Sequence, residues 1–303
     1  MLDQFLRDLV HGEISVGKRK FAFLDLLLVI CITGAAVMIR RSIFGIAGNP
    51  GIGDGTTMVL YCVLDFILAL FMTYFVWETT GSPLKTVGTY SLAVIWPVIA
   101  ANSALNGGAE VVNAVVMTGV LCAVGAKRFQ NKTNFWIFTL VVCFQQLLCS
   151  DGSGEKLTNC WPNIYTLFSE TGFVAEYGVT GKLLVLGILF LIFYYISKLE
   201  FKVTPKLLVS SGLFFSLLVS VFYPFMNYRS GLLANVFAIL LFIQNKKKCY
   251  VPMAMCIISY VSYGYYYNGK IDVFFWIYAL GLVVLMLDAG VYLYRQLHTG
   301  KTA

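Results

Sequence analysis

Charge is scarce in this sequence. Only 12% of its 303 residues are charged and 59% are hydrophobic, whereas soluble domains carry about 25% charged and about 45–50% apolar residues. A soluble fold of this length has too little interior to hide so much apolar surface, so the solvent must be lipid. The composition predicts an all-α, polytopic integral membrane protein with the lipid bilayer as its main partner.

Histidine is also rare, and one familiar motif is missing. The two histidines, His11 and His298, lie near the ends of the chain. This placement excludes His-based acyl transfer at the membrane centre, haem ligation and most zinc chemistry. There is no Gly-Lys-Ser/Thr phosphate loop, so the chain carries no recognisable ATPase of its own. We therefore predict no cofactor, with a divalent cation left open.

Long apolar runs, in contrast, fill the chain. A helix that crosses a membrane needs about 20 mainly apolar residues. Runs that reach or approach this length lie at 21–39, 57–78, 87–104, 109–126, 133–149, 182–198, 206–223, 230–244, 249–264 and 273–294. We expect about ten transmembrane helices in one domain at 21–295, followed by a cytoplasmic tail at 296–303.

The first 20 residues differ from these runs. Apolar residues between 2 and 10 recur at helical spacing, and the basic cluster 18–20 precedes the first long apolar run. We expect residues 1–20 to contain an amphipathic helix at 2–16 that lies on the cytoplasmic membrane surface. A short disordered tail is the alternative.

The basic residues predict the orientation. If the cluster at 18–20 is cytoplasmic, only six of the 22 Lys and Arg fall outside, and the remaining 16 lie in the inner loops and terminal segments. The outer residues are Arg40, Arg41, Lys156, Lys182, Arg229 and Lys270. The positive-inside rule favours this arrangement, which puts both termini in the cytoplasm of a multi-pass cell-membrane protein. The net charge of +7 is thus explained by topology, and no nucleic-acid partner is predicted.

The first outer loop, at 40–56, carries candidate ligand-binding groups. Arg40 and Arg41 end the first apolar run at the outer side, where guanidinium groups can bind a phosphate or diphosphate headgroup bidentately. Snorkelling to lipid phosphates is the alternative. Asp54 lies between glycines, whose backbone can approach a ligand closely, although such an Asp is commonly a turn former.

The outer connection at 150–181 is the one long loop. Long structured loops are commonly binding loops or lids. Cys149 and Cys160 bracket its polar half, so a disulfide between them is geometrically possible.

Several charged residues lie inside or at the ends of apolar runs, where ionisable groups are costly and often functional. Asp25 and Asp288 lie near cytoplasmic helix ends, where pairing with a nearby Lys or Arg is expected, and Asp65 is deeper and could be a hydrogen-bonded structural carboxyl. Glu110 and Arg229 lie near outer helix ends, within reach of the 40–56 loop.

Three outer-face segments together resemble one family. They are 96–110 (WPVIAANSALNGGAE), 157–165 (LTNCWPNIY) and 223–230 (YPFMNYRS). They look like the segments P-x-x-x-x-N-S-A-x-W-G-Q-x-D, N-A-P-N-hydrophobic-aromatic and P-x-M-H-E-R-Y of bacterial mannosyltransferase-like proteins. These belong to the GT-C class of glycosyltransferases that use lipid-phosphate sugars. The order agrees, and the resemblance covers roughly residues 20–260.

The chain departs from the family pattern at several positions. Asn106-Gly107-Gly108 replaces Trp-Gly-Gln, and Glu110 is the best match to the following Asp. Asn227 and Tyr228 replace His and Glu, which leaves Arg229 as the residue carried over. The first outer loop, where the family has its catalytic acid, is short and holds only Asp54.

The resemblance implies a mannosyltransferase-like mechanism at the outer face. A polyprenyl-phosphate sugar would enter from the outer leaflet, with its phosphate held by Arg40, Arg41 or Arg229. Asp54, or failing that Glu110, would act as general base on a glycan or lipid acceptor of the cell envelope. Asn102 and Asn163 would orient hydroxyl groups. The sugar, the acceptor and the oligomeric state are not specified.

Two other functional classes stay open. The eroded motifs also fit a non-catalytic membrane subunit or flippase-like partner in envelope glycan assembly. A small-molecule transporter is the third class, but transporters typically show an inverted repeat and helices broken by Gly or Pro in matching halves. This sequence shows no such repeat and has only seven prolines.

Overall fold

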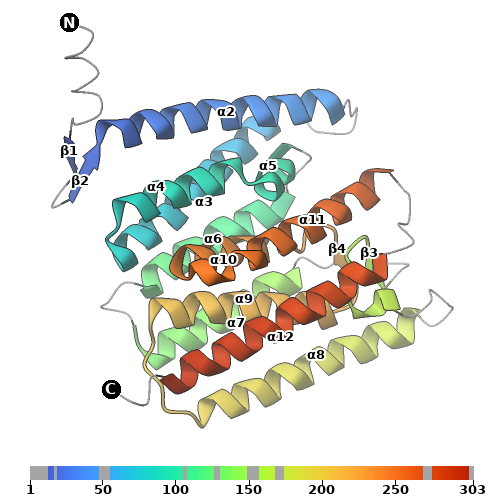
Figure 1. The fold of residues 1–303 in the computed structure, drawn as a ribbon. Coiled ribbons are helices and arrows are strands. Elements are labelled where there is room, and N and C mark those ends of the chain that lie inside the picture. The colour runs from blue at the N-terminus through green and yellow to red at the C-terminus, as the bar shows by residue number, and fades with distance from the viewer. Residues whose placement is uncertain are drawn as a thin grey trace, which may run out of the picture.

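The fold is a bundle of helices that run back and forth between two ends (Figure 1). The computed structural model describes residues 13–16, 19–47, 55–104, 108–125, 130–148, 157–167, 174–268 and 275–299. The helices are α2 (Phe23–Ala47), α3 (Gly55–Thr80), α4 (Pro83–Ile95), α5 (Pro97–Ala104), α6 (Gly108–Gly125), α7 (Lys132–Leu148), α8 (Val174–Ser197), α9 (Pro205–Phe222), α10 (Leu232–Gln244), α11 (Tyr250–Asn268) and α12 (Phe275–Thr299). Two short 3₁₀ helices are η2 (Ile164–Leu167) and η3 (Lys246–Lys248).

Six of the described helical segments are long and apolar enough to cross a membrane. They are Leu24–Ile43, Val59–Thr80, Pro83–Asn102, Tyr177–Ser197, Pro205–Phe222 and Phe275–Thr299. Two shorter apolar helices lie at Glu110–Gly125 and Leu232–Gln244. Each apolar run predicted from the sequence coincides with one of the helices above, except 87–104, which is divided between α4 and α5. The predicted helical fold is therefore confirmed, whereas ten crossings and their orientation stay predictions.

Two helices extend into predicted loops. The first outer loop was expected to begin at Arg40, but α2 continues to Ala47. The 150–181 loop was expected to end at residue 181, but α8 begins at Val174. In both cases the extra residues are mostly apolar and contain no proline, so nothing local stops the helix.

The N-terminal prediction needs a correction. Residues 13–16 are not helical: β1 (Glu13–Val16) pairs antiparallel with β2 (Arg19–Ala22). Polar and β-branched residues alternate at Glu13–Val16, and this period of two favours a strand over a helix. The rest of the expected helix, 2–12, lies outside the described residues. At the other terminus, α12 runs to Thr299, into the expected tail.

A break divides the third apolar run into α4 and α5. Trp96 has extended backbone (ψ 123°) and precedes Pro97, the first residue of α5. Proline disfavours helical backbone at the preceding residue and removes one N–H donor. The break therefore lets α5, which carries Asn102, leave the axis of α4.

The centre of the bundle is formed by α9 and α10. Nearly every residue of α10 is buried. Its 13 residues extend about 20 Å, which is less than the hydrocarbon core thickness of about 30 Å. The chain between α9 and α10, at 223–231, is not helical, so α10 begins only after this connection.

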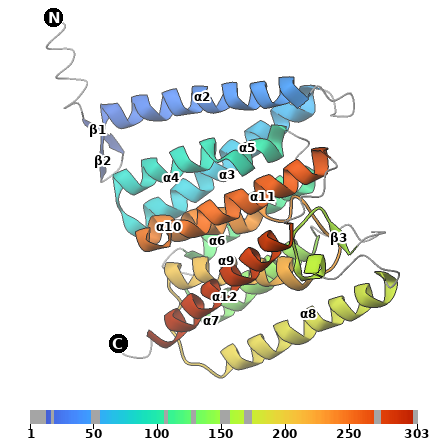
Figure 2. The ribbon, with the colours of Figure 1, turned by 45° about the vertical axis from the view of Figure 1, so that its right-hand side comes forward.

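The two ends of the bundle carry different features. The hairpin β1–β2 and the C-terminal end of α12 lie at the same end (Figures 1 and 2). Strands β3 (Thr158–Asn159) and β4 (Met226–Asn227) lie at the opposite end.

Candidate functional site

The connection between α9 and α10 holds the candidate site. Its residues Phe225, Met226, Asn227 and Tyr228 are all buried, although the backbone there is not helical. In membrane proteins, irregular backbone at depth is tolerated where protein surrounds it or where it lines a polar cavity. This connection therefore marks the place where chemistry is expected.

Backbone strain points to the same place. Among the described residues, the non-glycine positions with positive φ are Cys160 (60°) and Phe225 (63°). Positive φ is uncommon for bulky side chains, and such strain gathers at functional sites. These two residues flank one small sheet, because β3 pairs in parallel with β4 and Cys160 forms a bridge to Asn227.

The 157–167 segment holds the connection in place by capping α9. The last carbonyls of a helix lack partners within it. Here the Trp161 indole N–H donates to the Ser220 carbonyl (3.2 Å) and the Tyr165 hydroxyl donates to the Phe222 carbonyl (2.9 Å). Asn163 donates to the Tyr223 carbonyl (3.4 Å). Burial raises the pKa of Tyr165, so its donating, neutral form is favoured.

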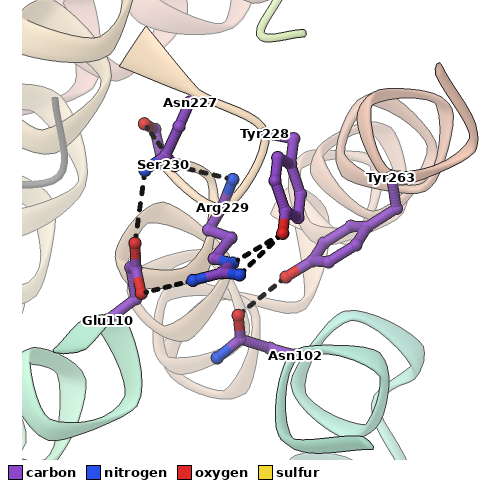
Figure 3. Close-up of polar contacts among 7 residues, drawn as sticks. All are labelled: Asn102, Glu110, Asn227, Tyr228, Arg229, Ser230 and Tyr263. Atoms are coloured by element: carbon purple, nitrogen blue, oxygen red, sulfur yellow. Dashed lines mark hydrogen bonds and ion pairs between the residues drawn. The ribbon is translucent and has the colours of Figure 1, made fainter. Parts of the chain in front are cut away.

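A carboxylate and a guanidinium meet at the centre of the site (Figure 3). Glu110 lies in the first turn of α6, where the helix dipole favours a negative charge. Arg229 Nη1 donates to Glu110 Oε2 over 3.5 Å, and Asn227 Nδ2 donates to Glu110 Oε1 over 3.3 Å. Both distances exceed the 2.7–2.9 Å that is typical of charge-assisted hydrogen bonds.

Tyrosines surround this pair. Arg229 donates from Nε and Nη2 to the Tyr228 hydroxyl, over 3.0 and 2.7 Å. The Tyr228 ring stacks on Tyr266 and meets Tyr263 edge-on. The Tyr263 hydroxyl donates to Asn102 Oδ1 over 2.8 Å. The Asn102 side chain is 1% exposed, and its Nδ2 has no hydrogen-bond partner among the described residues.

Arg229 remains protonated and positively charged. Burial opposes the charged form, but the neighbouring Tyr228 and Glu110 more than offset it and raise the pKa of Arg229 above its ordinary value. Its side chain remains 19% exposed. The site thus presents a fixed, half-buried cation beside a nearly buried carboxylate and an amide donor, which suits an anionic ligand that also carries hydroxyl groups.

The structure brings three of the predicted site residues together. Asn102, Glu110 and Arg229 come from α5, α6 and the α9–α10 connection, and all lie within one network of side chains (Figure 3). Asn163 is fully buried, and its amide bonds the backbone of Tyr223 and Tyr165. Asn163 therefore links the backbone of the 157–167 segment to the start of the α9–α10 connection. Its predicted contact with hydroxyl groups of a substrate remains untested.

The site residues predicted in the 40–56 loop are not part of this network among the described residues. Arg40 was expected at an exposed outer interface, but it is 1% exposed. Its guanidinium contacts Asp65 (3.0 Å) and donates to the Val94 carbonyl (2.9 Å) at the end of α4. Helix α2 continues to Ala47 and packs against α4 and α5, and the Arg40 side chain reaches Asp65 of α3. Arg41 is exposed on α2, and Asp54 lies outside the described residues, as does Cys149 of the predicted disulfide.

Two predictions about intramembrane carboxylates are confirmed. Asp65 is a structural carboxyl that accepts two hydrogen bonds from Arg40. Asp288 pairs with a lysine near the end of its helix, Lys248, at 2.7 Å.

Sequence reasoning missed part of the site. Tyr263 and Tyr266 were not predicted, although the run SYGYYYN at 262–268 places four tyrosines at the end of α11. Gln146 was also missed; its Nε2 donates to the Ser230 carbonyl over 2.7 Å. A cluster of tyrosines at a helix end is typical of an interfacial aromatic belt, so this pattern by itself does not indicate a binding role.

Among the described residues, no group of three or more His, Cys, Asp or Glu is arranged to hold a metal ion. No family model, curated protein or solved structure matches the chain. The site has to be interpreted from its own geometry.

Proposed function

We propose that this chain is a multi-pass membrane glycosyltransferase that moves a sugar from a polyprenyl-phosphate donor to a glycan or lipid acceptor. Its termini lie in the cytoplasm and its site faces outward. One observation carries the proposal: Asn102, Glu110 and Arg229 converge from three elements in one half-buried network. Each of them lies in, or next to, a segment that resembles the GT-C glycosyltransferases.

Each group has a role that fits its chemistry. Arg229 binds the phosphate of the donor and stabilises the charge that develops on it as it leaves. Glu110 accepts the proton of the acceptor hydroxyl. The hydroxyl oxygen forms the new bond to the anomeric carbon, the bond from that carbon to the phosphate oxygen breaks, and its electron pair leaves with the polyprenyl phosphate. Asn102 Nδ2 donates to an oxygen of the bound substrate.

Asp54 is the alternative base. It lies in the 48–54 gap between α2 and α3, and the resemblance places the catalytic acid of the family in that loop. Comparing Asp54→Asn with Glu110→Gln decides between the two carboxylates.

A non-catalytic role in envelope glycan assembly is the second candidate. It is favoured by the engagement of Glu110, because both oxygens of this carboxylate already accept hydrogen bonds, one from Arg229 and one from Asn227, and are less available to a substrate hydroxyl. Such a subunit would bind a lipid-linked sugar and leave it intact.

The test is release of polyprenyl phosphate. Purified protein in nanodiscs is incubated with polyprenyl-phosphate mannose or glucose, with and without an acceptor glycolipid. Wild type releases polyprenyl phosphate, and Arg229→Ala loses this activity by about 100-fold or more, the usual scale for removing a group that stabilises transition-state charge. Asp288→Asn, at the opposite end of the bundle, keeps it. Absence of release from every donor by the folded wild type favours the non-catalytic role.

A further inference from the structure

The ion pair between Glu110 and Arg229 differs from the two other ion pairs found among the described residues. The Arg40–Asp65 and Lys248–Asp288 pairs have N–O distances of 3.0 and 2.7 Å, whereas the Arg229–Glu110 distance is 3.5 Å. The Arg40–Asp65 pair is fully buried, but Arg229 is 19% exposed. This pair is therefore longer than both of the others and more accessible than the Arg40–Asp65 pair.

The guanidinium of Arg229 is only partly used. It has five N–H donors. Two reach the Tyr228 hydroxyl and one reaches Glu110, so two remain without a partner among the described residues. Because Tyr228 holds Nε and Nη2, it fixes the plane of the guanidinium whether or not Glu110 is in place.

A second donor near the pair also lacks a partner. Asn102 Nδ2 is buried and bonds no described residue, while Oδ1 of the same amide is fixed by Tyr263. In Figure 3, Glu110 lies beside the guanidinium of Arg229 and Asn102 lies below it. A buried donor without an acceptor is costly, and a ligand with several oxygens could satisfy Asn102 Nδ2 with one oxygen and the unused N–H groups of Arg229 with others.

From these contacts we infer that Glu110 is a resident competitor for the oxyanion site of Arg229, and that binding of a phosphate monoester displaces it. The phosphate carries more charge than a carboxylate and can accept from both Arg229 and Asn102. Displacement frees the Glu110 carboxylate from Arg229 for as long as the monoester is bound. In the proposed function this monoester is the polyprenyl phosphate that remains after the sugar has left, so its source rests on the proposed function, but the competition itself does not require transfer.

The signature of a competitor is that removing it strengthens binding. Glu110→Gln keeps the shape of the side chain and removes its charge, so phosphate affinity rises by about fivefold, the low end of the usual coupling between sites. Arg229→Gln lowers the affinity by about tenfold or more, the scale for losing a hydrogen bond to a charged group. The double variant binds as weakly as Arg229→Gln, because without the cation there is nothing to compete for.

The experiment measures equilibrium binding with no sugar present. Wild type and variants in phosphatidylcholine nanodiscs are titrated with radiolabelled farnesyl phosphate, and separately with radiolabelled inorganic phosphate, to distinguish a lipid-linked headgroup from the free ion. Asp288→Asn serves as the matched control, because it removes one carboxylate from an ion pair far from the site, and its affinity stays at the wild-type value. A thermal unfolding curve for each variant establishes that it is folded.

Each outcome decides the matter. Tighter binding by Glu110→Gln with either probe supports the inference and identifies the phosphate source. Unchanged or weaker binding by a folded Glu110→Gln overturns it, as does the absence of binding of both probes to wild type. If the binding pattern is found but no donor is turned over, sugar transfer is rejected and the competition stands.

Discussion

At the residue scale, one glycine sets how closely the site can pack. Gly231 ends the α9–α10 connection and is the N-cap of α10. A Cβ built there would lie 2.5 Å from Trp161 Cη2 and 2.5 Å from Ser259 Oγ. The glycine is thus required by close approach of the 157–167 segment and α11 to the backbone.

We predict that Gly231→Ala destabilises the protein by about 1–3 kcal/mol, the usual cost of overpacking a filled interior. The measurement is thermal unfolding in detergent, followed by tryptophan fluorescence. Gly34→Ala is the control, because a Cβ at Gly34 in α2 meets nothing within 4 Å and alanine favours a helix over glycine. Equal melting temperatures for the two variants would show that the contact with Trp161 is unimportant.

At the element scale, one buried ion pair joins three helices at the α4–α5 break. Arg40 of α2 binds Asp65 of α3 and donates to the Val94 carbonyl of α4. In a continuous helix that carbonyl would accept from residue 98, which now belongs to α5. The guanidinium therefore supplies a donor that the break removed, and it supports the position of α5.

We predict that Asp65→Asn destabilises the protein by about 3 kcal/mol, since it leaves the buried guanidinium without its counter-charge. The apolar double variant Arg40→Met/Asp65→Leu should be less harmful, because no buried charge remains. Thermal unfolding of the single and double variants provides the comparison. A double variant that is less stable than Asp65→Asn would contradict this account. It would indicate that the hydrogen bond from Arg40 to the Val94 carbonyl contributes more to stability than the unpaired charge costs.

At the scale of the whole molecule, the position of the basic residues predicts which side of the membrane the site faces. The described N-terminal hairpin and the C-terminal end of α12 share one end of the bundle, and the site lies near the other (Figures 1 and 2). Exposed Lys246 and Lys247 follow α10. Cationic loops remain on the cytoplasmic side, so the site is expected to face outward.

We predict that green fluorescent protein fused after Ala303 is fluorescent in a bacterial host, whereas alkaline phosphatase fused at the same position is inactive, because the first folds in the cytoplasm and the second requires the oxidising exterior. Whole-cell fluorescence and phosphatase activity are the measurements. The reverse pattern would invert the topology and would move the site of Arg229 to the inner face.

The sequence by itself determined the class of fold and most of its helices. Apolar runs of membrane-spanning length can be recognised locally, because hydropathy acts residue by residue and lipid requires helices. The sequence also marked Asn102, Glu110 and Arg229 as site candidates, through their positions at outer helix ends and their resemblance to family motifs. It failed at Glu13–Val16 and at the ends of α2 and α8, where strand pairing and helix extension compete over a few residues.

Only the tertiary structure decided which charges belong together. Arg40 and Arg229 look alike in the sequence, since both lie at the outer end of an apolar run. One is fully buried against Asp65 and the other stays half-buried beside Glu110. That difference depends on how α2, α3 and the α9–α10 connection pack against their neighbours. A charge finds its partner across helices that are far apart along the chain, and no local pattern of residues encodes such a contact.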